Sequence, residues 1–208
     1  MNRSSFAALL VAVALPAWAA PAGGDLFPLD VGRTWTYRMS VERGAERQPI
    51  EYTTRVARTE EIEGAGTFAV FESRSKQRVL HVARYRRDGD RLLVAPGSAG
   101  TEARVFFDLA AARRVLEGSD ERPTWTWQAD DGAAEGTVAL AGTEALLLRN
   151  VGTVTCVVIH DTRTVRGARQ ERHLWLAPGI GLVKETMTYR GPQGDLHTEA
   201  VLTRHTTP

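Results

Sequence analysis

The sequence has little cysteine, little lysine and no excess of charge of either sign. Its 208 residues include one cysteine, Cys156, and two lysines, Lys76 and Lys184. A lone cysteine excludes an internal disulfide, so the stability of the fold must come from a hydrophobic core. The formal net charge of +1 argues against a nucleic-acid-binding protein, since such proteins carry a concentrated basic excess. A hydrophobic content of 43% excludes wholesale disorder.

Long apolar runs are also scarce. The longest, Phe6–Leu15, follows Arg3 and precedes the small-residue site Ala17-Trp18-Ala19. This order is typical of a secretory signal peptide that is cleaved before Ala20. The run is too short for a membrane span, which needs about 20 apolar residues, and no other run is long enough. We therefore expect residues 1–19 to be removed and the remainder to be exported, to the periplasm or the medium, without a transmembrane anchor.

A two-residue period dominates the rest of the chain. Trp35, Tyr37, Met39 and Val41 alternate with polar neighbours, as in a strand with one buried face. Similar segments recur about every 8–12 residues, separated by turns that contain Gly, Pro or Asp. We therefore expect an all-β fold of antiparallel meanders, in the form of a curved sheet, an incomplete barrel or a two-layer sandwich.

One segment alone shows helical spacing. Phe106, Leu109 and Leu116 recur at helical intervals, and Gly118 follows where a C-cap glycine belongs. We therefore expect at most one short helix. Residues 20–26 are rich in Pro and Gly and are expected to be flexible, and residues 27–208 are expected to form a single β domain.

The two halves of that domain look alike. Trp35-Thr36-Tyr37 is echoed ninety residues later by Trp125-Thr126-Trp127. Both segments precede an apolar strand and then a hairpin with a glycine in its turn. Because such short matches are also common in unrelated strands, an internal duplication of residues 27–100 and 119–196 remains one alternative, and a single meander without repeats remains the other.

Three stretches together resemble a known group of proteins. They are Phe27-Pro28-Leu29 with Gly32, Trp35 and Tyr37; Gly152-Thr153 with Cys156; and Trp175, Ala177-Pro178-Gly179, Gly181 and Val183-Lys184. Over residues 27–190 the chain resembles a broad group of poorly characterised exported bacterial β-proteins, many of them lipoproteins. These proteins open with F-P-L-x-x-G-x-x-W-x-Y and close with W-x-A-P-G-x-G-L-V-K. A looser similarity to periplasmic lipid and lipoprotein carriers implies an apolar concave face and assigns no catalytic residue.

Recognisable catalytic motifs are lacking. Ser98 lies in Pro-Gly-Ser-Ala-Gly, but Pro96 takes the place of the first glycine of a nucleophile elbow. His160 and Asp161 are neighbours on a predicted strand and point to opposite faces, so their side chains cannot pair. Cys156 and His160 lie about 13 Å apart along that strand, too far for activation of the thiol. We expect Cys156 to be a small buried hydrophobe and the protein to have no catalytic residue.

Metal-binding and charged clusters are equally sparse. His197 and Glu199 share one strand face and His205 lies on the same strand, but a metal site needs several converging ligands. We therefore expect no metal and no cofactor. The basic run at residues 84–87 is expected to be a solvated sheet edge that discourages aggregation, or else a contact for an acidic partner.

Aromatic side chains are the best remaining lead to a ligand. The candidate ligand-binding residues are Trp35, Tyr37, Trp125, Trp127 and Trp175. Trp35 and Tyr37 share one strand face, as do Trp125 and Trp127. Such rings bind apolar and amphipathic molecules, but they also fill cores, and the sequence leaves both interpretations open.

Three functions follow from these patterns. The first is an exported, non-catalytic carrier of an apolar or amphipathic small molecule. A carrier of this kind should have a cavity of roughly several hundred Å³ that is connected to solvent. The second is a structural or interaction subunit that binds another envelope protein and has a filled core. The third and least favoured is an envelope hydrolase, whose titratable groups would converge only in three dimensions.

Overall fold

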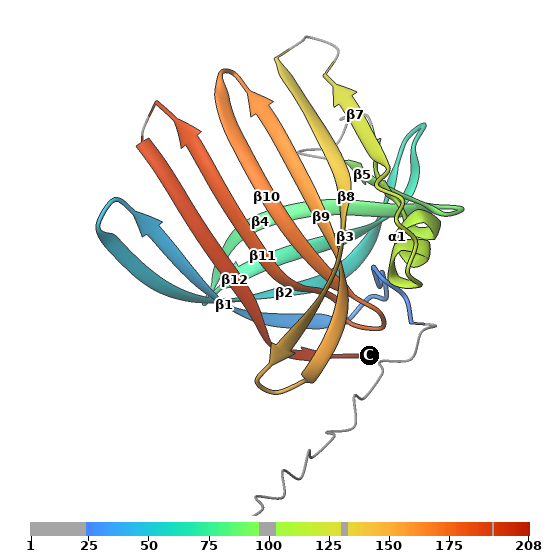
Figure 1. Ribbon diagram of the computed structural model, residues 1–208, viewed down its shortest axis with the longest axis horizontal. Coiled ribbons are helices and arrows are strands. Elements are labelled where there is room, and N and C mark those ends of the chain that lie inside the picture. Colours follow the sequence, from blue (N-terminus) through green and yellow to red (C-terminus); the bar gives the residue numbers. More distant parts are fainter. Residues whose placement is uncertain (1–23, 96–102, 130–132, 193) are drawn as a thin grey trace, which may run out of the picture.

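The computed structural model describes residues 24–95, 103–129, 133–192 and 194–208, and it confirms the all-β prediction (Figure 1). Twelve strands form one antiparallel sheet, accompanied by one short helix. The strands are β1 (Thr34–Arg43), β2 (Glu46–Ile62), β3 (Gly66–Ser75), β4 (Arg78–Asp88), β5 (Arg91–Ala95), β6 (Arg104–Asp108), β7 (Thr124–Gln128), β8 (Ala134–Leu148), β9 (Gly152–Val165), β10 (Ala168–Ala177), β11 (Gly181–Gly191) and β12 (Gly194–Thr206). The helix is α1 (Leu109–Leu116).

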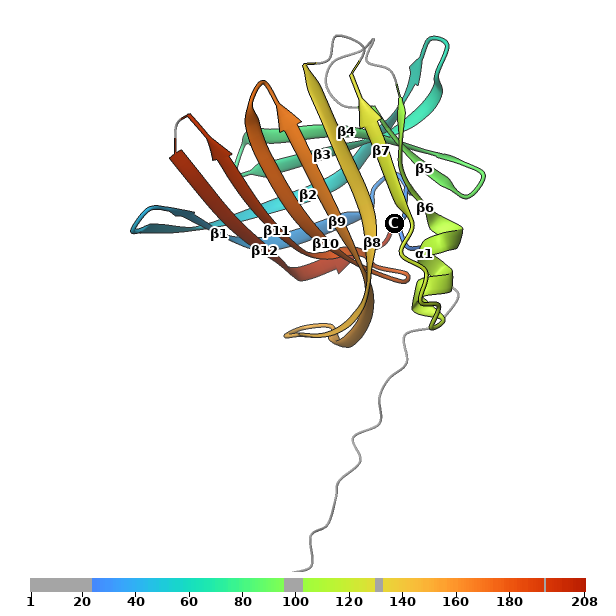
Figure 2. The same ribbon diagram turned by 45° about the horizontal axis from the view of Figure 1, so that its top comes forward.

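The sheet is built from two consecutive meanders. Its strand order is β6-β5-β4-β3-β2-β1-β12-β11-β10-β9-β8-β7, so the two meanders join where β1 pairs with β12. The sheet curves until its two halves face each other, in a nearly closed barrel (Figures 1 and 2). Register shifts in β12, β2 and β8 contribute to this curvature, because a β-bulge bends the strand that carries it.

The helix begins later than its apolar spacing predicted. Asp108 is the N-cap, and its Oδ1 accepts a hydrogen bond of 2.8 Å from the Ala111 backbone N–H. Phe106, which we placed in the helix, lies instead on β6. Gly118 follows the helix with a φ of 101°, a left-handed conformation that favours glycine. Within the described residues, no helix is long and apolar enough to cross a membrane.

The buried face of α1 packs into the interior of the barrel. Its buried residues join inward-facing side chains of β5, β8, β9 and β10 in one hydrophobic cluster, which also contains Leu26. Leu26 belongs to the N-terminal segment that we expected to be flexible, yet its side chain is fully buried. Its neighbour Asp25 forms an ion pair with Arg87 and accepts a hydrogen bond from the Gly179 N–H. The packed part of the domain therefore starts before residue 27.

The two meanders share irregular features at matching places. Lys76, in the β3–β4 turn, has a φ of 55°, and Arg166, ninety residues later in the β9–β10 turn, has a φ of 49°. Positive φ is uncommon for residues other than glycine, and in both places it occurs in a tight turn between paired strands. A register shift in β2 also has a counterpart in β8. One meander runs from β1 to β6 and the other from β7 to β12, and an internal duplication stays a prediction.

Candidate functional site

A cavity of about 180 Å³ lies on the concave side of the sheet, between the two meanders. One side of it is lined by β1 to β6 and the other by β9 to β11. Its apolar lining includes Phe27, Trp35, Phe71, Tyr85, Phe106, Leu174, Leu176 and Leu182. Its polar lining includes Tyr37, Tyr52, His81, Arg104, Arg163, Arg172 and Glu185. His81 is exposed, so the cavity reaches solvent on that side.

The apolar part is a continuous aromatic cluster. Phe71 is at its centre, with ring centroids 5.6 Å from Phe27, 5.8 Å from Trp35 and 5.1 Å from Tyr85. Tyr85 then contacts Phe106 at 6.2 Å. These separations are typical of favourable stacked and edge-to-face pairs. The cluster gives the cavity a rigid apolar wall drawn from the N-terminal segment and from four strands.

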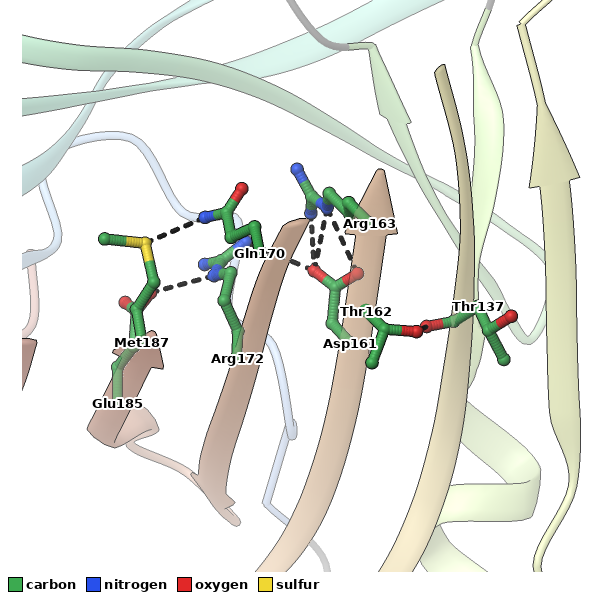
Figure 3. A network of polar contacts seen from close by, with 8 residues as sticks. All are labelled: Thr137, Asp161, Thr162, Arg163, Gln170, Arg172, Glu185 and Met187. Atoms are coloured by element: carbon green, nitrogen blue, oxygen red, sulfur yellow. Dashed lines mark hydrogen bonds and ion pairs between the residues drawn. The ribbon is translucent and has the colours of Figure 1, made fainter. Parts of the chain in front are cut away.

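An ion network lies on the opposite wall, on β9, β10 and β11 (Figure 3). Asp161 is fully buried, and its Oδ2 lies 2.6 Å from Arg163 Nη2 and 3.3 Å from Arg172 Nη1. Arg172 Nε donates in turn to Glu185 Oε1 at 2.9 Å. Burial alone would lower the pKa of Arg172, but Glu185 and Asp161 raise it above its ordinary value. The network therefore keeps Arg172 cationic inside the barrel.

Arg104 is the third arginine of the cavity, and it is bound differently. Its guanidinium lies 3.3 Å from the centre of the Trp127 ring. Its Nε and Nη1 atoms are buried and have no hydrogen-bond partner among the described residues. Burial, followed by the charge of Arg163, lowers the pKa of Arg104 to about 10. Arg104 therefore remains cationic at neutral pH.

Two of the five candidate ligand-binding residues line this cavity. Trp35 and Tyr37 are both buried on β1. Trp35 Nε1 donates to the Ile180 carbonyl at 2.6 Å, and the Tyr37 hydroxyl donates to the Leu182 carbonyl at 2.8 Å. These bonds tie β1 to the turn and strand on the far side of the cavity. Their rings contribute apolar surface, while their polar groups are already satisfied.

The other three candidates lie outside the lining. Trp125 is partly buried against the cluster around α1. Trp127 lies beneath Arg104 and lines a second, polar groove at the ends of β7, β8 and β9. Trp175 alternates with cavity-lining residues of β10, so it faces the other side of the sheet, where its Nε1 donates to Glu144 Oε2 at 2.8 Å. The fold therefore does not gather the five aromatics into one site.

The residues considered for catalysis do not form a reactive group. Cys156 is fully buried, and burial, together with the charge of Glu144, raises the pKa of its thiol to about 12. Asp161 binds arginines and not His160, whose ring instead lies 4.4 Å from that of His173. In the described ranges, no group of three or more potential metal ligands comes together. Ser98 lies outside the described residues.

The basic run on β4 is not a solvated sheet edge. β4 pairs with β3 on one side and β5 on the other, so it is an inner strand. The Arg84 side chain is only 12% exposed and contacts Glu60, Arg86 lies 5.5 Å above the Phe68 ring, and Arg87 pairs with Asp25. The prediction was wrong because a local run of charge does not reveal whether a strand has neighbours.

Sequence reasoning missed the charged wall of the cavity, although a signal for it exists. Arg172 is in phase with the apolar residues Leu174 and Leu176 on β10, and all three line the cavity. Asp161 and Arg163 likewise share the face of β9 that carries the buried Ile159. A charged residue in phase with the buried face of a strand is the pattern that predicts an internal polar site.

Comparisons with known proteins identify a fold and no family. No protein-family model matches the sequence, and no curated protein matches it. A candidate exported protein with a YmcC-like fold from Bacteroides fragilis shares 15% identity over 88% of this chain and 100% of that chain, with a TM-score of 0.51. A candidate lipoprotein from Parabacteroides distasonis shares 12% identity over 88% and 99% of the two chains, with a TM-score of 0.49. The first likeness confirms the predicted resemblance to poorly characterised exported β-proteins, and it concerns the fold alone.

Proposed function

We propose that this protein is an exported, non-catalytic carrier that holds an apolar or amphipathic ligand in the cavity between its two meanders. The single observation that carries the proposal is this cavity, with an aromatic cluster on one wall and a few charged groups on the other. Sites for small molecules usually combine a mostly apolar lining with a few placed polar groups. Export to the periplasm or the medium is supported by the signal-peptide pattern at residues 1–19, which lie outside the described residues.

The size of the cavity limits the ligand. Its volume of about 180 Å³ is below the several hundred Å³ that we expected for a carrier. It is also below the roughly 300–1,000 Å³ of pockets that enclose drug-sized molecules. A ligand with one narrow apolar chain therefore fits the proposal better than a lipid with two chains.

An interaction subunit of an envelope assembly is the second candidate. Leu147 on β8 and Val79 and Leu80 on β4 are large apolar side chains exposed at the surface, and such side chains can mark a contact with a partner protein.

A hydrolase has the least support. The carboxylates of Asp161 and Glu185 are held by arginines, and a general base must be free to reach a proton.

Binding of the apolar fluorescent probe N-phenyl-naphthylamine to the protein that spans residues 20–208 tests the carrier function. We expect saturable binding with a rise in probe fluorescence. Ala83 lines the cavity, so Ala83→Phe should fill it and weaken probe binding by at least about tenfold. Ala145 is exposed on β8, so the matched control Ala145→Phe should bind the probe as the wild type does.

Overpacking can also destabilise a core, so thermal unfolding should accompany each titration. The smaller change Ala83→Leu gives a second measurement if Ala83→Phe does not fold. Native mass spectrometry of protein purified gently from its own host should show additional mass that is lost on denaturation. Absence of saturable probe binding, together with a bare protein mass, would overturn the carrier function.

A further inference from the structure

We infer that the ligand has an anionic headgroup, a carboxylate or a phosphate, attached to a single apolar chain, and that Arg104 binds this headgroup at the polar end of the cavity. The inference rests on the proposed function, since it names the class of ligand that the cavity takes. Three independent features carry it: the balance of charge on the cavity wall, the unpaired donors of Arg104, and the position of Arg104 beside the aromatic cluster.

The arginines of the cavity outnumber the carboxylates that neutralise them. Arg163 Nε donates to both carboxylate oxygens of Asp161, at 3.1 and 3.0 Å. Arg172 binds both Asp161 and Glu185. The charges of Arg163 and Arg172 are therefore compensated within the network. Among the described residues Arg104 forms no ion pair, so it leaves this wall with one uncompensated positive charge.

The hydrogen-bond donors of Arg104 are also unpaired. Its Nε and Nη1 are out of contact with solvent and have no partner in the described part of the chain. Buried donors without partners are rare in native proteins, because the group has lost its hydrogen bonds to water and gained none in exchange. A ligand that displaces the protein atoms covering Nε and Nη1 would supply the missing acceptors.

Stacking on Trp127 prepares Arg104 for this role. The indole ring covers one face of the guanidinium, with the guanidinium carbon 3.3 Å from the ring centre. A guanidinium that stacks through its face keeps the N–H donors of its plane available. Those donors form a rigid fork that matches a carboxylate or a phosphate and can bind two of its oxygens at once.

The headgroup site adjoins the apolar part of the cavity. Arg104 and Phe106 both line it from β6, two residues apart in the sequence. Phe106 contacts Tyr85, which contacts Phe71, so the aromatic cluster continues away from Arg104. A free inorganic anion would leave this apolar surface unused. A molecule with an anionic head and one apolar chain would occupy both parts.

A series of ligands with the same chain and different heads tests the inference. The series consists of dodecanoate, dodecyl phosphate, dodecanol and dodecyltrimethylammonium. Each is titrated in competition with the fluorescent probe, the charged compounds below their micelle concentrations and dodecanol below its solubility limit. Inorganic phosphate and acetate are titrated alone, to separate a headgroup site from a site for a free anion. We expect both anionic amphiphiles to bind at least about tenfold more tightly than dodecanol, and the free anions at least about a hundredfold more weakly than the amphiphiles.

Substitutions of Arg104 then assign the preference to this residue. Arg104→Gln should abolish the preference for anionic heads and leave the affinity for dodecanol unchanged. Arg104→Lys, which keeps the charge and loses the fork, should retain part of the preference. Arg190 is exposed on β11, and the control Arg190→Gln should keep the full preference. Thermal unfolding of each variant shows whether it is folded.

The possible failures are distinguishable. If dodecanol binds as tightly as dodecanoate and Arg104→Gln changes nothing, the inference is overturned and the carrier function stands. If no member of the series displaces the probe and none binds by calorimetry, both are overturned. If inorganic phosphate binds as tightly as dodecyl phosphate, the site takes a free anion, and the inference of an amphipathic ligand is wrong.

Discussion

Neutralising Asp161 is the sharpest test of how the charged wall of the cavity is held together. Asp161 is 0% exposed and is the acceptor shared by Arg163 and Arg172. In Asp161→Asn the side chain keeps nearly the same size but loses its charge, and its amide group presents N–H donors to guanidinium donors. Arg163 then has no carboxylate partner among the described residues, and Arg172 keeps only Glu185.

The expected loss can be scaled from the exposure of the partners. Removing one member of a buried ion pair typically costs about 3–5 kcal/mol. The side chains of Arg163 and Arg172 are 21% and 18% exposed, so water partly compensates them, and Arg172 retains Glu185. We therefore expect Asp161→Asn to lower the free energy of unfolding by about 2–3 kcal/mol. For a domain of this size that corresponds to a decrease in Tm of roughly 4–12 °C.

The measurement is urea unfolding of the wild type and the variant, followed by circular dichroism and checked by thermal melts. The matched control is Asp195→Asn, because Asp195 and Arg190 are 73% and 60% exposed and lie 4.0 Å apart. An exposed pair of this kind should change stability by less than about 0.5 kcal/mol. If both substitutions have the same small effect, water already screens the network, and our account of a buried charge wall is refuted.

Two further predictions concern hydrogen bonding and pH. Trp35→Phe removes the donor to the Ile180 carbonyl and should cost about 1–3 kcal/mol of stability, whereas Trp127→Phe, whose Nε1 has no partner in the described part of the chain, should cost less than about 1 kcal/mol. Urea midpoints measure both, and equal losses would contradict the structural role of the Trp35 bond. Burial lowers the pKa of His173, so the unfolded state takes up its proton first, and stability should fall as the pH drops from about 6.5 through the lower folded-state pKa. Melts between neutral and mildly acidic pH should show a shallower decline for His173→Gln, and an unchanged slope would exclude His173 as a contributor.

The strand pattern and the approximate number of strands could be predicted from the sequence because they depend on neighbours along the chain. Residues such as Trp35 and Tyr37 alternate with polar ones, and this alternation alone requires an extended segment with one buried face. The turns could be predicted from dipeptides that contain glycine, including Asp88-Gly89 between β4 and β5. The position of the helix was predicted correctly, but its start was placed too early, at Phe106. This residue fits an apolar helix face and an inward-facing strand position equally well.

The candidate site was only partly predictable. Trp35 and Tyr37 line the cavity, whereas Trp175 is separated from them by the thickness of the sheet. Its side is set by the regular alternation along β10, where Leu174 and Leu176 line the cavity. Aromatic content therefore indicated that a ligand site was plausible without indicating which rings would form it.

The sequence by itself determined that the chain folds into antiparallel strands around an apolar core, and its N-terminal pattern predicts an exported protein. Which inward faces meet across the barrel was decided only by the tertiary structure. Arg104 lies over Trp127 because the curved sheet brings its two edge strands, β6 and β7, close together. Arg172 lies between Asp161 and Glu185 because β9, β10 and β11 pair in a particular register. A shift of one residue in that register would turn every side chain of a strand to the other face. Local patterns carry no record of that register, and so the partners of each charged side chain in the cavity emerged only from the folded chain.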